Sequence, residues 1–137
     1  MEDKLLKITP DKEKVLSIIR MVETTLEMIK EMNKNKFPSN VTKEYYEIIR
    51  ELISIVLLLD GYKSIGDGAH KKQIEYLETN YKNFNKAEIN LIDDLRIIRN
   101  KISYDGFFVK EDYLNRKLIN INEIINKLNE TINKKLK

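Results

Sequence analysis

Apolar residues recur every three or four positions along most of the chain, the spacing that places them on one face of a helix. The pattern is most regular near the two ends. After Pro10, Asp11 can cap a first helix that ends within residues 33–36, and a last helix runs from about Glu111 to Lys134. The apolar positions of these two helices are Val15, Ile19, Val22, Leu26, Ile29, Leu114, Leu118, Ile121, Ile125, Leu128 and Ile132.

Three further helices are predicted between these two. The second begins near Thr42 and ends at about Asp60. Its segment 52–59 is apolar on nearly every side, so we expect it to be the central and most buried helix. The third covers roughly residues 69–81, and the fourth runs from about residue 86 to residue 103. The stretch 61–68 contains three glycines and is predicted to be a loop.

Five helices with short connections predict an all-α fold, a single-domain antiparallel bundle over residues 1–137. The chain has only four Gly and two Pro, too few turn residues for a β-sandwich or a β-barrel. The heptad spacing of the first and last helices is also typical of a coiled coil. Over so few heptads, however, such spacing is more often the seam of a bundle.

Composition excludes several classes of function. A net charge of +3 is too small to indicate a nucleic-acid-binding protein by itself. Without cysteine there are no disulfides or thiolate metal sites, and a single histidine excludes a multi-histidine metal site. The glycines lack the Lys-Ser/Thr of a phosphate loop. Because we identify no signal peptide and no apolar run long enough to span a bilayer, we expect a cytoplasmic protein with no cofactor and no membrane partner.

Arginine is scarce in this chain, with five Arg against 20 Lys. Two of the five, Arg96 and Arg99, lie one turn apart near the end of the fourth helix, and Ser103 follows on the same side. Asn100 and Tyr104 are i,i+4 neighbours beside them. Guanidinium groups bind phosphates, an amide can orient a polar group and a phenol can stack on a base. These five are the candidate binding residues. In the alternative, the arginines only interact with the helix dipole.

The acidic residues nearby are better explained as ion pairs than as an acid–base site. Asp93 precedes Arg96 by one turn, a spacing at which the two side chains can pair. The pairs Glu44/Glu47 and Asp93/Asp94 lack the histidines that accompany the glutamates of a di-iron bundle.

The segment Arg99-Asn100-Lys101-Ile102-Ser103-Tyr104 resembles the R-N-x-x-x-H motif of the HEPN domains, which are small α-helical proteins and typically dimeric. A bundle with an apolar second helix is also similar to that fold. The resemblance implies a homodimer with an RNA-binding cleft, where the Arg and His of active members cut RNA without a metal. It also implies a nucleotidyltransferase-type antitoxin as the protein partner, because many members are toxins. Other members are binding or scaffold modules.

Tyr104 stands where the family motif has histidine. An imidazole with a pKa near about 6.5 exchanges protons at neutral pH, whereas a phenol with a pKa of about 10 does so poorly. General acid–base catalysis contributes about 10²–10⁴-fold to a rate. We therefore expect Arg99 and Tyr104, the candidate catalytic residues, to form a weak or inactive site.

Two other features have a structural interpretation and a less favoured functional one. His70, at the start of the third helix, is expected to be solvated, and its alternative role is that of a substitute base. The segment 107–109, Phe-Phe-Val, is expected to pack over the end of the bundle, and its alternative role is to close a cleft or a dimer.

Three hypotheses follow. We favour a HEPN-like dimer that binds RNA or a nucleotide through Arg99, Asn100 and Tyr104, is catalytically weak or inactive and belongs to a toxin–antitoxin pair. The first alternative is an active metal-independent ribonuclease toxin. The second is a non-catalytic protein-interaction bundle, in which the arginine pair is structural.

Overall fold

The computed structural model describes residues 4–137, so residues 1–3 of the predicted domain lie outside the described residues. In chain order the elements are β1 (Lys4–Lys7), α1 (Lys12–Glu31), α2 (Pro38–Asp60), β2 (Tyr62–Ile65), α3 (Ala69–Asn80), α4 (Lys86–Asp105) and α5 (Glu111–Leu136). The five helices of this part of the chain confirm the all-α class. The structure adds one small sheet of two strands.

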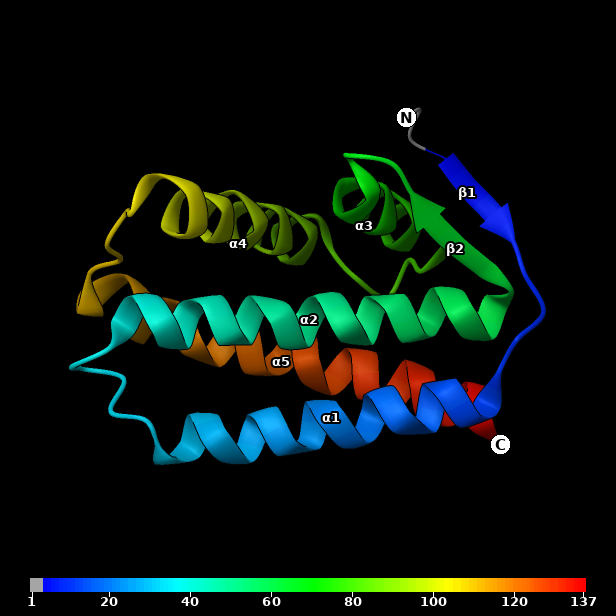
Figure 1. Cartoon of the computed structure of the whole chain (residues 1–137), viewed down its shortest axis with the longest axis horizontal. Helices are drawn as coiled ribbons and strands as arrows, with labels where there is room; N and C mark the ends of the chain where they lie inside the picture. The colour runs from blue at the N-terminus through cyan, green and yellow to red at the C-terminus, as the bar shows by residue number, and fades with distance from the viewer. Residues whose placement is uncertain (1–3) are drawn as a thin grey trace.

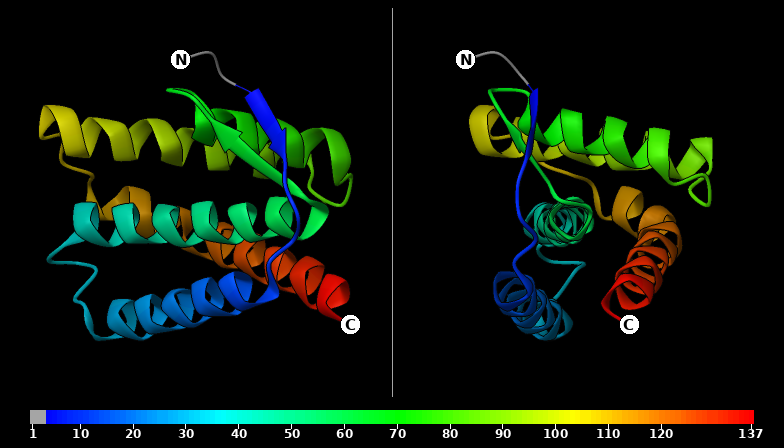
Figure 2. Two further views of the ribbon diagram at one scale, coloured as in Figure 1. Left: turned by 45° about the vertical axis from the view of Figure 1, so that its right-hand side comes forward. Right: turned by 90° about the vertical axis from the view of Figure 1, so that its right-hand side faces the viewer.

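Helix α2 lies at the centre of the bundle, as its sequence predicts. Helices α1, α5 and the pair α3 and α4 surround it, and each of them contacts it (Figures 1 and 2). Within the segment 52–59, every residue except Ser54 and Leu59 is buried. The helix begins at Pro38, a turn earlier than expected, because proline is favoured in the first turn, where its missing N–H would have no helical partner.

Helix α4, which carries the motif, has well-defined ends. Asn85 and Glu88 form a capping box at its start: the Asn85 side chain accepts from the Glu88 N–H at 2.8 Å, and the Glu88 side chain accepts from the Asn85 N–H at 2.9 Å. At its end Gly106 has φ +64°, and the Phe107 N–H donates to the Lys101 carbonyl at 3.1 Å. The motif residues therefore occupy the last turns of a helix that stops sharply.

The predicted loop over residues 61–68 is wrong in part, because residues 62–65 form β2 and pair antiparallel with β1. Strands of four residues are too short for a two-residue alternation to stand out in the sequence. The Ile8 N–H also donates to the Gly61 carbonyl at 2.9 Å. The strand pair thus ties the chain before α1 to the end of α2.

The segment after α4 packs only partly as expected. Val109 is buried, and its backbone N–H donates to the Ser39 hydroxyl near the start of α2 at 2.7 Å. Phe107 and Phe108 remain 46% and 85% exposed. The prediction that the aromatic pair packs over the bundle end is therefore wrong for Phe108. Neighbouring side chains of an extended segment point in opposite directions, so an inward Val109 directs Phe108 outward.

Candidate functional site

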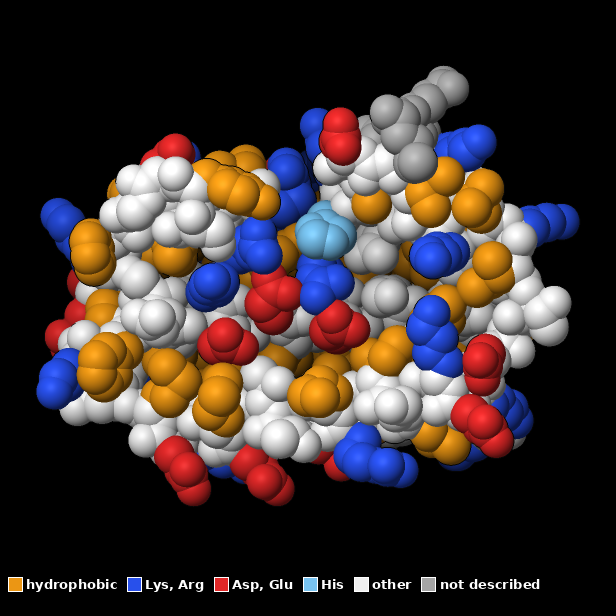
Figure 3. Space-filling model, in the orientation of Figure 1, with side chains coloured by type: hydrophobic (Ala, Val, Ile, Leu, Met, Phe, Trp, Pro, Cys, Tyr) orange, Lys and Arg blue, Asp and Glu red, His pale blue; other side chains and the backbone are white. Residues whose placement is uncertain are grey.

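The end of α4 and the start of α3 form a depression of about 250 Å³, which we call the α3–α4 depression. Its lining residues are Asp67, Gly68, His70, Lys71, Arg96, Arg99, Asn100 and Tyr104. Figure 3 shows this face, where basic and acidic side chains gather around the single histidine of the chain. Of the candidate binding residues, only Ser103 is not part of the lining, and it is exposed.

The spacing of the motif explains why four of its residues meet there. Arg96, Arg99, Asn100 and Tyr104 are separated by steps of three, one and four residues, which keeps them along one side of α4. Tyr104 lies at the last turn and is 77% exposed, so its ring is accessible to a ligand. Arg96 and Arg99 are half-buried.

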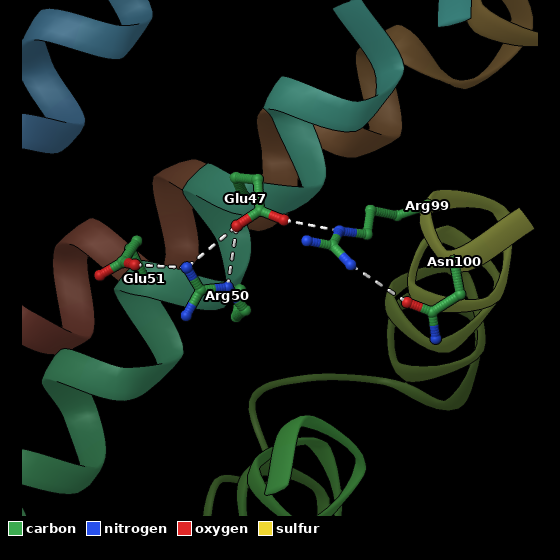
Figure 4. A network of polar contacts seen from close by, with 5 residues as sticks. All are labelled: Glu47, Arg50, Glu51, Arg99 and Asn100. Carbon is green, nitrogen blue, oxygen red and sulfur yellow. Dashed lines mark hydrogen bonds and ion pairs between the residues drawn. The ribbon is translucent and has the colours of Figure 1, made fainter. Parts of the chain in front are cut away.

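Arg99 reaches from α4 to α2. Its Nε donates to Glu47 Oε1 at 2.9 Å, and its Nη1 donates to Asn100 Oδ1 at 3.4 Å (Figure 4). The side chains of Arg99 and Glu47 are 24% and 23% exposed, so the pair is only partly screened by water. The contact holds the Nε side of the guanidinium toward α2 and orients its plane.

Glu47 also binds a second arginine. Its Oε2 accepts from Arg50 Nε at 3.0 Å, and Arg50 in turn pairs with Glu51 on the same helix (Figure 4). One carboxylate is therefore shared by two guanidinium groups. This agrees with the interpretation of Glu47 as an ion-pair residue. The partner from α4, 52 residues away in the chain, is not visible in the sequence.

Arg96 pairs within its own helix. Its Nε donates to Asp93 Oδ1 at 2.8 Å, which confirms the pair expected from their spacing. Both motif arginines thus use Nε for a carboxylate. A guanidinium has five N–H donors, so the Nη groups provide further donors for a ligand in the depression.

His70 is where the structure departs most from the expectation. The prediction of a solvated histidine is wrong: His70 begins α3 as expected, but it is half-buried in the α3–α4 depression. Burial lowers the pKa of its imidazole, Arg50 and Arg99 lower it further, and Glu47 and Glu51 oppose them. His70 is therefore mainly neutral at pH 7. Sequence reasoning missed its place because the first turn of α3 meets the end of α4 only in the fold.

The electrostatics of the depression are balanced. The lining contains three fixed cations, Lys71, Arg96 and Arg99, against the single carboxylate of Asp67. Behind the lining, Glu47 and Asp93 offset much of the charge of the two arginines. An anion placed in the depression would meet directed N–H donors and not a strong positive field.

Residues 4–137 show neither a metal site nor a membrane-spanning helix. No group of three or more His, Asp or Glu side chains is placed to hold a metal ion. No helix in the same range has the length and apolar character needed to cross a membrane.

Comparisons with known proteins add no relative. No family model matches the chain, and neither curated proteins nor solved structures give a match. The resemblance to HEPN domains therefore stays a prediction that rests on the motif in α4.

Proposed function

We propose that the chain binds the phosphate groups of RNA or of a nucleotide in the α3–α4 depression, through Arg96 and Arg99. Asn100 orients a polar group of the ligand, and Tyr104 stacks on a base. The observation that carries this proposal is the convergence of these four side chains, with Lys71, on one depression of about 250 Å³. The volume suits one phosphate with its ribose and leaves the rest of a strand on the surface.

The chemistry of the side chains supports phosphate recognition. Carboxylates hold the Nε side of both arginines, which restricts rotation of the guanidinium groups before a ligand arrives. Planar guanidinium donors match the oxygens of a phosphate better than an ammonium does. The accessible ring of Tyr104 at the rim provides the stacking surface typical of single-stranded RNA sites.

Substitution of Arg99 tests the proposal. Arg99→Lys keeps a cation for Glu47 but removes the fork of donors, and Arg96→Ala removes one phosphate contact directly. We expect each to weaken binding of a labelled single-stranded RNA by roughly 10-fold or more, the value of one charged hydrogen bond. Arg96→Ala should also lower the salt dependence of binding. Fluorescence anisotropy at low and moderate salt measures both effects, and competition by ATP separates RNA from nucleotide binding.

Arg20→Ala is the matched control, because Arg20 is an exposed arginine on α1 that does not line the depression. It changes the net charge as Arg96→Ala does and is expected to alter affinity by less than about twofold. Equal binding by the wild type, Arg96→Ala and Arg99→Lys would overturn the proposal.

A second candidate function, protein interaction, is favoured by a different observation. Phe107 and Phe108 border a groove of about 410 Å³ between the end of α4 and the start of α5, whose lining also includes Ile98, Val109 and Tyr113. Exposed aromatic side chains beside such a groove are typical of an interface. A homodimer and a nucleotidyltransferase-type antitoxin are the partners we propose for this surface.

Phe108→Ser tests that second candidate. Phe108 is 85% exposed, so the substitution should leave the unfolding temperature almost unchanged. In sedimentation equilibrium we expect a dimeric mass for the wild type and a monomeric mass for Phe108→Ser. A monomeric wild type would remove the homodimer from the proposal.

A further inference from the structure

We propose that the groove between the end of α4 and the start of α5, which we call the α4–α5 groove, binds a small apolar carboxylate of the size of a medium-chain fatty acid. The groove shares no lining residue with the α3–α4 depression, so the proposal does not depend on RNA binding. Within the second candidate function, it assigns a small ligand and not a protein to the groove itself.

Apolar side chains form most of the wall of the groove. Five of its nine lining residues are apolar or aromatic, namely Ile98, Phe107, Phe108, Val109 and Tyr113. Its volume of about 410 Å³ lies within the range of roughly 300–1,000 Å³ that is typical of small-molecule sites. Phe107 and Phe108 leave much of their rings in water, and an alkyl chain laid against them would remove that apolar surface from water.

The wall is held in place before a ligand arrives. The Val109 N–H donates to the Ser39 hydroxyl at 2.7 Å, and the Phe107 N–H donates to the Lys101 carbonyl at 3.1 Å. These two hydrogen bonds anchor both ends of the segment 107–109. In Figure 1 this connection from α4 to α5 lies at the end of the bundle opposite the strand pair. An anchored wall loses little conformational freedom on binding, which favours a ligand that makes few contacts.

The cations beside the apolar wall indicate the charge of the ligand. Arg116 pairs with Asp112 at 3.0 Å, whereas Lys101 and Lys110 form no ion pair within residues 4–137. The Lys101 ammonium lies 5.8 Å from the centre of the Phe107 ring, so that a cation and the apolar wall adjoin. The ligand that complements both features has an anionic group next to an apolar chain.

Other occupants match these features less well. A neutral apolar molecule leaves both lysines without a counter-charge. A second copy of this chain, packed groove against groove, brings two more lysines to the same place, and like charges repel. A phosphate ester is matched best by the planar guanidinium of an arginine, but Arg116 already pairs with a carboxylate. A carboxylate on an apolar chain is therefore the favoured ligand.

The experiment follows the isotope-labelled full chain by two-dimensional NMR during titration with decanoate, below the concentration at which decanoate forms micelles. We expect saturable shifts, with one decanoate per chain, confined to the amides of residues 98–116 and the adjacent start of α2. Decanol has the same chain without the charge, and acetate has the charge without the chain. Decanol should bind about tenfold more weakly, the value of a charged hydrogen bond, and acetate should give no saturable shift.

A pair of double variants tests the charge. Lys101→Gln with Lys110→Gln removes both lysines of the groove, and we expect the affinity for decanoate to fall by about tenfold. Lys14→Gln with Lys30→Gln is the matched control, because it removes two exposed cations of α1 that do not line the groove. The control should change the affinity by less than about twofold. Decanol should bind equally to both double variants.

Phe108→Ser tests the wall. We expect both decanoate and decanol to bind at least about fivefold more weakly to this variant, because both lie against the same ring. Ile119→Ser is the matched control, since Ile119 on α5 is 72% exposed and is not part of the lining. Both variants should keep the unfolding temperature of the wild type, so that a loss of binding is not a loss of the fold.

Several results would overturn the proposal. Equal binding of decanoate and decanol would mean that the lysines do not select an anion. Shifts spread over exposed apolar residues elsewhere, such as Met21, would mean adsorption to apolar surface in general. Unchanged affinity in the variants of the groove would place the ligand elsewhere. A dimeric wild type without groove shifts in decanoate, or binding of a short peptide of Glu and Phe where decanoate fails, would make a protein the occupant.

Discussion

Glu47 of α2 and Arg99 of α4 form an ion pair with 2.9 Å between Oε1 and Nε, and it joins the central helix to the motif. The pair has two opposite consequences. It fixes the orientation of Arg99, and it neutralises part of the charge that a phosphate would meet. Because Glu47 also binds Arg50, removing its charge affects two guanidinium groups at once.

Glu47→Gln is predicted to strengthen binding of RNA while it weakens the fold. The amide no longer offsets the charge of Arg99, so we expect affinity for a short RNA to rise by about threefold to tenfold at low salt. The lost charge-assisted hydrogen bonds should lower the free energy of unfolding by about 1–2 kcal/mol. Anisotropy and urea unfolding measure the two effects.

Glu44→Gln is the control for that experiment, because Glu44 lies one turn earlier on α2 and has no ion pair in the described part of the chain. It removes the same charge and should change stability by less than about 0.5 kcal/mol. If both variants bind RNA equally well, net charge explains the gain and the specific role of Glu47 is wrong.

Asp60, at the end of α2, is predicted to make the fold sensitive to acid. Its carboxylate accepts hydrogen bonds from Tyr76 at 2.7 Å, from Tyr81 at 2.5 Å and from Lys135. Burial alone would raise the pKa of Asp60, but these hydrogen bonds outweigh it and hold that pKa below 3.8. A depressed folded-state pKa contributes stability that is fully present above the ordinary value near about 4 and is lost as pH falls through the folded value.

Urea unfolding at several pH values between neutrality and pH 3 or so tests the role of Asp60. The free energy of unfolding of the wild type should fall on acidification, and Asp60→Asn should be less stable at neutral pH and lose less on acidification. Asp67→Asn is the comparison, because Asp67 is exposed. The same acid loss in wild type and Asp60→Asn would place the effect on other carboxylates.

Much of the fold could be predicted from periodicity alone. The apolar segment 52–59 indicates the buried centre, and the spacing of Asp93 and Arg96 indicates their pair, because both are local properties of one helix. The strand pair could not be predicted, since each strand is too short to show a pattern and pairs with residues far along the chain. The spacing of residues within one segment gives no information on contacts between segments that are far apart in the chain.

The candidate site could likewise be predicted only in part, namely the part that lies on one helix. Arg96, Arg99, Asn100 and Tyr104 share one side of one helix, and the structure brings them together as their spacing implies. His70 could not be placed there, because its position depends on how the start of α3 packs beside the end of α4. A solvated histidine and a half-buried one have the same local sequence.

Ser39 is predicted to hold the segment after the motif. Its hydroxyl accepts the only hydrogen bond found for the Val109 N–H within the described residues, and both residues are buried. Ser39→Ala leaves that N–H without a partner, which should cost about 1–3 kcal/mol. Ser103→Ala, at an exposed position, should cost less than about 0.5 kcal/mol. Thermal unfolding of both variants decides this, and equal melting temperatures would contradict the role of Ser39.

Two glycines allow a matched test of backbone strain. Gly61 and Gly106 both end helices with positive φ, +88° and +64°, a conformation that costs an L-residue about 1–2 kcal/mol. A Cβ at Gly61 would lie 3.2 Å from the Ile8 carbonyl oxygen, whereas one at Gly106 would meet nothing within 4 Å. Gly61→Ala should therefore destabilise more than Gly106→Ala, by an added amount on the order of 1 kcal/mol.

Chemical denaturation of both alanine variants measures that difference. Because the Ile8 N–H donates to the Gly61 carbonyl, the extra cost of Gly61→Ala should come with faster hydrogen exchange at Ile8 and along β1 and β2. Gly106→Ala should leave those amides protected and instead affect the last turn of α4. If the two variants are equally destabilised and the amides of β1 and β2 stay protected in Gly61→Ala, the strand pair accommodates the added methyl group at no cost in stability, and the prediction is wrong.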